Sequence, residues 1–275
     1  MRQRLTGYSL SVVIALCASL LLLSFQSQAQ QQSEDGQTTT ALTIILAGPH
    51  RSEAERARDQ YRHPLETLSW FGIQDNMTVV EIWPGRGWYT AILAPFLKEG
   101  GRYYAATFEN VQPLKDKLAA SPNLYSKVIL TELIPPSKTD IAPEGTADIV
   151  LTFRNVHNWM SRGYAEEVFK AMYRALKPGG ILGVVEHRGN PAVPQDPKAA
   201  SGYVNEDYVI KLAEDAGFRL AGRSEINANP KDAKDYPQGV WTLPPTLRLK
   251  DVDREKYLAI GESDRLTLKF TKPAS

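Results

Sequence analysis

Short apolar runs of strand length, separated by turns and helical patterns, constrain the fold of this chain more than any other feature. In chain order the runs are MTVVEI, RYYAATF, SKVILTEL, ADIVLTF and ILGVVEH. Runs without strict alternation are typical of strands that are buried on both faces of a parallel sheet. Strands that alternate with helices at this spacing predict an α/β fold with a doubly wound, mostly parallel sheet.

Apolar positions at helical spacing predict the helices between these strands. We expect a second helix to begin at Pro64, because proline fits the first turn of a helix and disfavours helix just before it. The expected helical segments are residues 51–73, 91–97, 111–120, 164–176 and 205–217.

The N-terminus resembles an export signal. A basic start, MRQR, precedes an apolar stretch from about Ser9 to Ser24. Ser27 and Ala29 then fit the small-residue rule for cleavage after Ala29. We therefore expect a cleaved signal peptide over residues 1–29 and a periplasmic protein of a Gram-negative bacterium. A retained membrane anchor is the alternative, since the apolar stretch is near the lower length for a spanning helix.

Cleavage would leave 246 residues, in which residues 30–50 are expected to be a flexible leader and residues 51–275 a single domain. The leader is rich in Gln, Thr and Ser and shows no sustained period. Cleavage would also remove Cys17, the only cysteine, which excludes disulfides and thiolate metal sites. The remaining 30 basic and 31 acidic side chains give no electrostatic footprint for nucleic acid. No stable membrane insertion is expected after cleavage.

The turn EIWPGRGWYT, residues 81–90, follows the first strand and opens a helix. Many folds hold a nucleotide in such a strand, glycine turn and helix. Gly85 and Gly87 match the first two glycines of a dinucleotide fingerprint, but Thr90 stands at the third position. Glu81 places a carboxylate at the end of the strand. The acid and the glycine pair together indicate a ligand site.

These residues resemble the class I S-adenosylmethionine (SAM)-dependent methyltransferases. The chain is most similar to predicted exported bacterial methyltransferases that share the turn WPGxGWYTxILAP. The phrases YRHPLETL, ADIVLTFRNVHNW, ALKPGG, GVWTLPPTL and GESDRLTLKF also match, so the resemblance covers nearly all of residues 51–272. It implies a Rossmann-like sheet of seven strands in which RLAGRSEI and DRLTLKF are the last two and the last strand is antiparallel.

The resemblance also implies contacts with the cofactor SAM. Glu81 would lie near its methionine end, while Gly85 and Gly87 would let the backbone approach it, because a β-carbon there would collide with the ligand. Two departures stand out. The general pattern has a glycine at Trp83, and the acid expected at the ribose aligns with Thr107. The remaining candidate cofactor contacts are Glu109, two residues beyond Thr107, and Asn155 after the fourth strand.

The aromatic residues of the turn have two interpretations. Trp83, Trp88 and Tyr89 can pack in the core, since large aromatics usually supply buried area. One of them can instead line the adenine or sulfonium site, because an aromatic face attracts a cation.

The candidate catalytic and substrate-binding residues are sought where the strands end, since ligands of an open α/β sheet bind beyond the carboxyl ends of its strands. His157, after the fourth strand, and His187, at the end of the fifth, are the candidate general bases, with His157 favoured. A structural hydrogen-bonding role is the alternative for both. The candidate substrate contacts are Arg62, His63, Arg154 and Trp241. We expect Asp264 and Arg265 to form a structural ion pair, and His50 to be exposed.

Two other reaction classes are not supported. The four histidines show no close paired ligand spacing, so no metal site is expected. A serine hydrolase would need a G-x-S-x-G elbow, which the sequence lacks. The long proline-containing loop over residues 227–245 is expected to be a lid, a binding surface or the cover of a sheet edge.

Two functions remain open. The first is a SAM-dependent methyltransferase that acts on a small or medium-sized acceptor. The second is a non-catalytic binding protein with a methyltransferase fold, for SAM or another nucleoside-like ligand. The second is motivated by export, because SAM is made in the cytoplasm. The sequence indicates neither the acceptor nor the oligomeric state.

Overall fold

The computed structural model describes residues 30, 33 and 35–274. The expected signal peptide and its cleavage site lie outside these residues. Within the described part of the chain, no helix combines the length and the apolar character that crossing a membrane requires.

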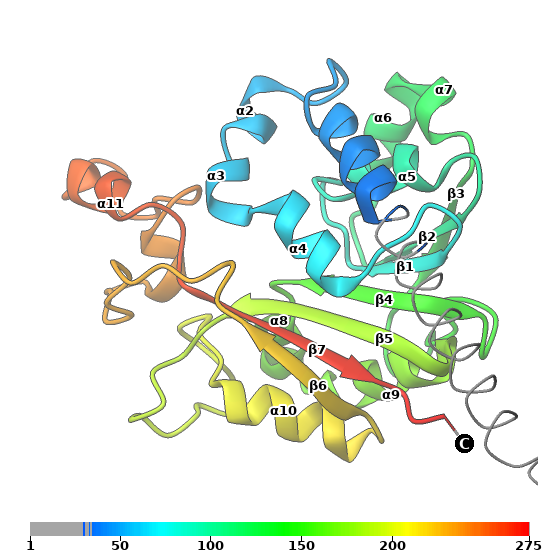
Figure 1. Ribbon diagram of the computed structural model, residues 1–275. Coiled ribbons are helices and arrows are strands. Elements are labelled where there is room, and N and C mark those ends of the chain that lie inside the picture. The colour runs from blue at the N-terminus through cyan, green and yellow to red at the C-terminus, as the bar shows by residue number, and fades with distance from the viewer. Residues whose placement is uncertain (1–29, 31–32, 34, 275) are drawn as a thin grey trace, which may run out of the picture.

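One sheet of seven strands organises the molecule, in the order β3-β2-β1-β4-β5-β7-β6 (Figure 1). The first five strands pair in parallel, and β7 is antiparallel to both of its neighbours. This confirms the predicted fold class. The strands are β1 (Thr78–Ile82), β2 (Arg102–Thr107), β3 (Val128–Glu132), β4 (Ala147–Phe153), β5 (Leu176–His187), β6 (Arg219–Ser224) and β7 (Arg265–Thr271).

Helices cover both faces of the sheet. On one face lie α4 (Pro64–Phe71) and α5 (Thr90–Leu97), and on the other lie α8 (Val156–Arg162), α9 (Ala165–Ala175) and α10 (Glu206–Asp215) (Figure 1). Further helices are α2 (Glu53–Arg56), α3 (Asp59–Arg62), α6 (Gln112–Ala120), α7 (Pro122–Tyr125), the 3-10 turn η1 (Gly239–Thr242) and α11 (Arg254–Ile260). Pro64 is the first residue of α4, as predicted.

Burial on both faces explains why the central strands are mostly apolar. Successive side chains of a strand point to opposite faces. Val79 of β1 therefore packs in the cluster that contains Phe71 of α4, whereas Val80 packs in the cluster that contains Phe169 of α9. In β4 every residue except Asp148 is buried.

The expected flexible leader differs from the structure over residues 35–46, which are helical. Leu42 in this segment is fully buried, and the Thr38 hydroxyl donates a hydrogen bond to Gln74 Oε1 at 2.7 Å. Packing against the domain, rather than an apolar period of its own, stabilises this helix. His50 is half-buried instead of exposed, with Nε2 2.9 Å from the Ala91 carbonyl oxygen.

Two further segments differ from the sequence expectation. The residues KPGG, expected to separate a helix from the fifth strand, lie within β5 itself. The segment after β4, expected to be a loop, forms α8 and includes His157. The short, mixed sequence VHNWMSR gives little apolar period, but its buried Trp159 and Met160 hold the helix on the sheet.

Candidate functional site

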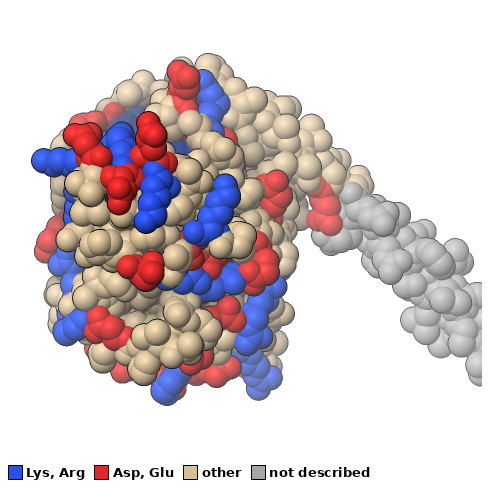
Figure 2. All heavy atoms as spheres, turned by 90° about the vertical axis from the view of Figure 1, so that its left-hand side faces the viewer, with Lys and Arg blue, Asp and Glu red and all other residues tan. Residues whose placement is uncertain are grey.

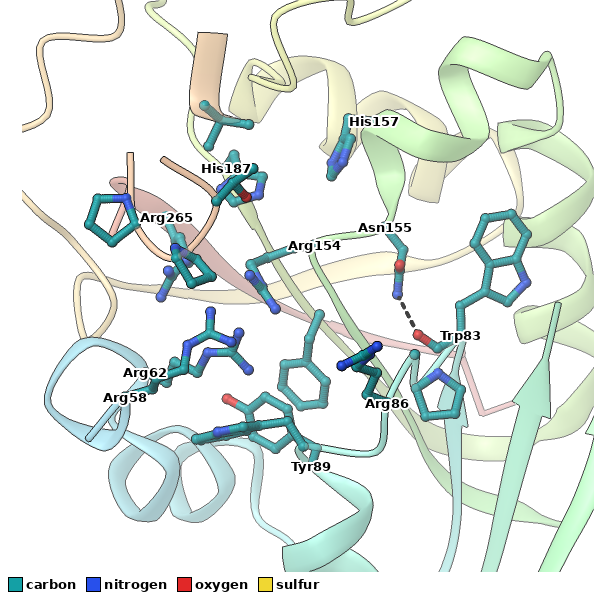
Figure 3. Close-up of a pocket in the computed structure, with 18 of the residues that line it drawn as sticks. Arg58, Arg62, Trp83, Arg86, Tyr89, Arg154, Asn155, His157, His187 and Arg265 are labelled. Carbon is teal, nitrogen blue, oxygen red and sulfur yellow. Dashed lines mark hydrogen bonds between the residues drawn. The ribbon is translucent and has the colours of Figure 1, made fainter. Parts of the chain in front are cut away.

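A cavity of about 360 Å³ lies beyond the carboxyl ends of β1, β4 and β5, where the topology predicts a ligand site (Figure 3). Its lining comes from the glycine turn, the ends of β4 and β5, helix α3 and the start of β7. The polar and aromatic lining residues include Arg58, Arg62, Glu81, Trp83, Arg86, Trp88, Tyr89, Arg154, Asn155, His157, His187, Trp241 and Arg265.

The two glycines of the turn have different surroundings. Both have a positive φ, +60° at Gly85 and +79° at Gly87, which disfavours any residue with a β-carbon. A β-carbon on Gly85 would meet no protein atom within 4 Å, and Gly85 lines the cavity. On Gly87 it would lie 2.8 Å from Leu114 Cδ1. Gly85 therefore keeps space open for a ligand, whereas Gly87 lets the turn pack on α6.

Trp83 occupies the position where the general pattern has a glycine. Its φ of +47° lies in the left-handed region, which glycine adopts more readily than other residues. The indole Nε1 donates to the Leu133 carbonyl oxygen at 3.0 Å, and the ring lies 4.3 Å from that of Phe108. These contacts support the packing interpretation. Trp83 also lines the cavity, so its ring forms part of the wall at the same time.

Glu81 is almost fully buried at the end of β1 and accepts hydrogen bonds from the Tyr103 and Thr90 hydroxyls. Burial raises the pKa of Glu81 to about 7, against the opposing effect of these hydrogen bonds and of Arg62. The residue lines the cavity below the glycine turn.

A second cavity of about 260 Å³ lies on the other side of the turn, next to the end of β2. Thr107 and Glu109, the candidates for ribose contacts, both line it. The Thr107 hydroxyl donates to the Thr131 carbonyl oxygen at 2.9 Å, whereas the Glu109 side chain is exposed. Trp83, Pro84, Gly85 and Asn155 line both cavities, which therefore meet at the turn.

Asn155 connects the ends of two central strands. Its Nδ2 donates to the Ile82 carbonyl oxygen of β1 at 2.9 Å. It also donates to the Trp83 carbonyl oxygen at 3.4 Å (Figure 3). The side-chain nitrogen is therefore committed to the protein, and the side-chain oxygen remains as the group that can accept a hydrogen bond from a ligand.

The structure brings His157, Glu186 and His187 together. His157 Nδ1 lies 3.1 Å from Glu186 Oε1, and the carboxylate also accepts the backbone N–H groups of His157 and His187. With its Nδ1 proton held by Glu186, His157 would present an unprotonated Nε2. This is the arrangement of a histidine that an acid orients for proton transfer.

His187 is the other candidate base. Its Nδ1 is hydrogen-bonded to the Ser263 hydroxyl, and its ring centre lies 5.3 Å from that of His157. Burial lowers the pKa of His187 well below its ordinary value, and His157 and Arg154 lower it further. His187 is therefore neutral at physiological pH.

All three residues are also possible metal ligands. One ligand atom from each lies within 4.8 Å of the others. The sequence predicted that His157 and His187 lie at the same edge of the sheet, but not the contact of Glu186 with His157, because spacing along the chain does not show how these side chains point. The Glu186 carboxylate is engaged by two N–H groups and one imidazole, and the neighbouring Arg154 and Arg265 disfavour a further cation.

The predicted substrate contacts are separated by the structure. Arg62, Arg154 and Trp241 line the large cavity, with the Trp241 ring centre 6.0 Å from that of His157. His63 does not line it. Its φ of +40° at the junction of α3 and α4 directs it to a different depression, beside Asn227.

Sequence reasoning missed a carboxylate that organises three of the arginines. Glu262 pairs with Arg58, Arg62 and Arg265. Burial alone would raise its pKa, but Arg265 and Arg62 hold the pKa of Glu262 at about 2. The expected ion pair of Asp264 with Arg265 is wrong, since Asp264 pairs with Lys234 at 2.8 Å and Arg188 at 3.7 Å. Arg265 is close to Glu262 in sequence, but Arg58 and Arg62 are distant from it, as Lys234 and Arg188 are from Asp264, so spacing along the chain gives no signal for these pairs.

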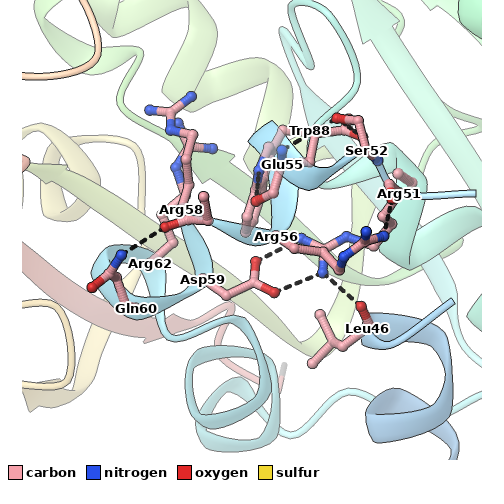
Figure 4. Close-up of polar contacts among 12 residues, drawn as sticks. Leu46, Arg51, Ser52, Glu55, Arg56, Arg58, Asp59, Gln60, Arg62 and Trp88 are labelled. Atoms are coloured by element: carbon pink, nitrogen blue, oxygen red, sulfur yellow. Dashed lines mark hydrogen bonds and ion pairs between the residues drawn. The ribbon is translucent and has the colours of Figure 1, made fainter. Parts of the chain in front are cut away.

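Helices α2 and α3 hold one wall of the cavity in place (Figure 4). Arg51, fully buried, forms a bidentate ion pair with Asp59 at 2.6 and 2.7 Å. Trp88 donates its indole N–H to the Glu55 carbonyl oxygen at 3.1 Å, and Arg62 lies over the Trp88 ring at 4.4 Å. Trp88 is thus both a packing residue and a support for Arg62.

No protein-family model and no curated protein matches this sequence. Solved structures match its fold. A SAM-dependent methyltransferase from Aquifex aeolicus has a TM-score of 0.54 and 18% identity, over 84% of this chain and 98% of that chain. A geranyl diphosphate C-methyltransferase from Streptomyces coelicolor A3(2) has a TM-score of 0.53 and 15% identity, over 83% and 87%.

The [4+2]-cyclase SpnF is also similar, with a TM-score of 0.56 and 16% identity over 89% of this chain and 96% of that chain. At these identities the likeness concerns the fold. The chain therefore has a Rossmann-like fold, which it shares with the class I methyltransferases among its structural neighbours.

Proposed function

We propose that this protein is a SAM-dependent methyltransferase that acts on a small or medium-sized acceptor. The observation that carries the proposal is the turn at the end of β1. Gly85 leaves space for a ligand there, Glu81 lies below it, and two cavities meet across it. A ligand with a nucleoside part and an amino acid part needs such a divided site. The methyltransferases among the structural neighbours support the same assignment.

SAM, when bound, would supply an activated methyl group on a sulfonium centre. Gly85, Glu81 and Asn155 would hold its methionine part, and Thr107 and Glu109 would face its ribose. Methyl transfer is an in-line displacement, so the protein mainly positions the two reacting groups. Where the acceptor carries a proton, His157 Nε2 would remove it, and Glu186 would stabilise the imidazolium that forms. Arg62, Arg154 and Trp241 would contact the acceptor.

The test of this proposal is the replacement of Glu81 by Ala, followed by isothermal titration with SAM and with its demethylated product, S-adenosylhomocysteine. We expect the wild-type protein to bind both ligands in the micromolar range or more tightly, and the variant to lose this binding. Unchanged affinity in a folded Glu81→Ala variant would contradict the assignment of the turn.

The second candidate function is a binding protein, or an enzyme of another reaction class, that uses the same cavities for another nucleoside-like ligand. Trp83 in place of the general glycine favours it, because the indole fills part of the second cavity's wall. The similarity to a [4+2]-cyclase shows that neighbours of this fold are not all methyltransferases. A nucleoside ligand whose affinity survives Glu81→Ala would favour this candidate.

We also propose that the protein is exported and cleaved after Ala29. N-terminal sequencing of protein purified from the periplasm of an expressing Gram-negative host would show Gln30 as the first residue. An intact N-terminus in the membrane fraction would support a retained anchor instead.

A further inference from the structure

Five arginines line the large cavity, and they come from four separate parts of the fold. Arg58 and Arg62 lie in and before α3, Arg86 in the glycine turn, Arg154 after β4 and Arg265 at the start of β7. Their side chains project toward the same space (Figure 3). On the face of the molecule that Figure 2 shows, acidic and basic side chains are interspersed.

Few negative charges balance these arginines. Among the residues that the structure describes, Glu81 is the only carboxylate that lines the cavity, and Glu262 is the shared partner of Arg58, Arg62 and Arg265. Five guanidinium groups therefore face two carboxylates. Within the described part of the chain, the guanidinium groups of Arg86 and Arg154 have no hydrogen bond or ion pair.

Several buried N–H groups in this cluster also lack an acceptor. Among the described residues, Arg58 Nη2, the Nε and Nη2 of Arg62 and Arg265 Nε have no hydrogen-bond partner. Arg62 and Arg265 are almost fully buried, at 3% and 2% exposure. An unsatisfied buried donor destabilises the folded protein, so the protein gains stability when a ligand supplies the acceptor.

The ionisation of the cluster agrees with a missing anion. Burial and the nearby Arg265 lower the pKa of Arg154 to about 10, which leaves the guanidinium charged at neutral pH. Burial and Arg154 lower the pKa of Arg62 well below its ordinary value. Mutual repulsion of this kind is relieved when an anion binds between the groups.

We propose that the acceptor is an anion, with a carboxylate or phosphate group held by Arg154, Arg86 and the free edges of Arg58 and Arg62, and with an apolar body. Planar guanidinium groups bind such oxyanions in bidentate pairs. Tyr89, Phe153 and Trp241 supply apolar surface in the same cavity. His157 lies across from the arginines and would face the acceptor's nucleophile. This inference rests on the proposed methyl transfer, which defines the anion as an acceptor.

The cofactor itself has a carboxylate, which one of these arginines can bind. A single carboxylate is satisfied by one or two guanidinium groups, whereas the cavity presents five. The proposal therefore requires that an anion still binds when the cofactor site is filled.

The experiment is isothermal titration of two probes, inorganic pyrophosphate and benzoate, into the free protein and into protein saturated with S-adenosylhomocysteine, at low and constant chloride. We expect at least one probe to bind in both states. Stronger binding of pyrophosphate would indicate a phosphate acceptor, and stronger binding of benzoate a carboxylate with an apolar body.

Arg154→Gln is the informative variant, because Arg154 has no carboxylate partner that its loss would leave unpaired. Loss of one charge-assisted contact should lower the affinity for the probe about tenfold. Arg223→Gln is the matched control, because Arg223 is exposed on β6, pairs with Glu206 and, like Glu206, does not line the cavity. The control should bind the probe as the wild-type protein does.

Binding of neither probe, or equal loss in both variants, would overturn the anion proposal. Binding that disappears on saturation with S-adenosylhomocysteine would also overturn it, because the arginines would then serve the cofactor's carboxylate. A protein that binds a probe but not S-adenosylhomocysteine would retain the anion site and contradict the proposed methyl transfer instead.

Discussion

Trp83 combines an unfavourable backbone with favourable packing. Its positive φ costs about 1–2 kcal/mol for a residue with a β-carbon. The half-buried indole packs on Phe108 and Trp159 and donates to Leu133. Removal of a fully buried Trp side chain typically costs about 3–5 kcal/mol, which is an upper range for Trp83. The packing is therefore worth more than the strain.

We expect Trp83→Gly to lower the free energy of unfolding by about 1–4 kcal/mol, which is the packing loss less the strain relieved. The lower end applies, because the indole is only half-buried. Urea unfolding of both proteins measures this difference. An increase in stability would mean that the strain outweighs the packing.

Glu81 should make stability depend on pH. Its folded pKa of about 7 lies above the ordinary value of 4.5, so the folded state holds its proton more tightly than the unfolded state. The free energy of unfolding should therefore fall as pH rises from about 4.5 to about 7, by roughly 3 kcal/mol at most. Glu81→Gln should remove this contribution.

Urea unfolding at pH 5 and pH 8 tests the expectation. The wild-type protein should lose more stability between these pH values than the Glu81→Gln variant loses. Parallel losses in the two proteins would show that Glu81 does not titrate in this range.

The contact between Glu186 and His157 makes a prediction about the imidazole tautomer. We expect neutral His157 to carry its proton on Nδ1, and Glu186→Ala to shift the proton toward Nε2. Nitrogen-15 NMR of the histidine rings measures the tautomer. Ser263→Ala is the control, since it removes the partner of His187 and leaves the His157 contact in place. A wild-type ring protonated on Nε2 would contradict the proposed base.

At the scale of elements, the helix over residues 35–46 was not predicted by the sequence pattern, and packing against the domain stabilises it. Leu42 is fully buried, while Ile44 on the same helix is 68% exposed. We expect Leu42→Ala to lower the free energy of unfolding by about 2–5 kcal/mol, because it leaves a cavity in the core. Ile44→Ala should change it by less than about 0.5 kcal/mol.

Chemical denaturation of the two variants gives the comparison. Equal and small effects would show that residues 35–46 do not pack on the domain in solution, in agreement with the flexible leader expected from the sequence.

Some elements could be predicted because their residues signal them locally. The strands β1 and β4 are mostly apolar because both of their faces are buried, and Pro64 marks the start of α4. Helix α8 and the helix over residues 35–46 have mixed sequences, and only contacts with distant residues stabilise them. For the same reason the sequence did not show the pairing of Glu262 with Arg58 and Arg62.

At the scale of the whole molecule, the sheet order determines which groups meet. The neighbouring strands β1, β4 and β5 end at one edge, so Glu81, Arg154 and His187 line a single cavity although more than a hundred residues separate the first from the last. The topology and the edge were predictable from the alternation of strands and helices. The arginine cluster was not, because it also depends on how α3 and β7 pack over that edge.

The central claim is that the turn at the end of β1 binds SAM, and one pair of variants tests it most directly. Gly85 and Gly145 both have a positive φ, at +60° and +68°, and a β-carbon on either would meet no protein atom within 4 Å. Both are exposed, but only Gly85 lines the cavity. Replacement by Arg therefore imposes the same backbone strain at the two positions and fills the ligand space at one.

The measurement is isothermal titration of SAM into the purified wild-type protein, Gly85→Arg and Gly145→Arg. We expect micromolar or tighter binding to the wild-type protein and to Gly145→Arg, and no binding to a folded Gly85→Arg. Absence of binding to the wild-type protein at millimolar SAM, or equal binding to all three proteins, would contradict the account.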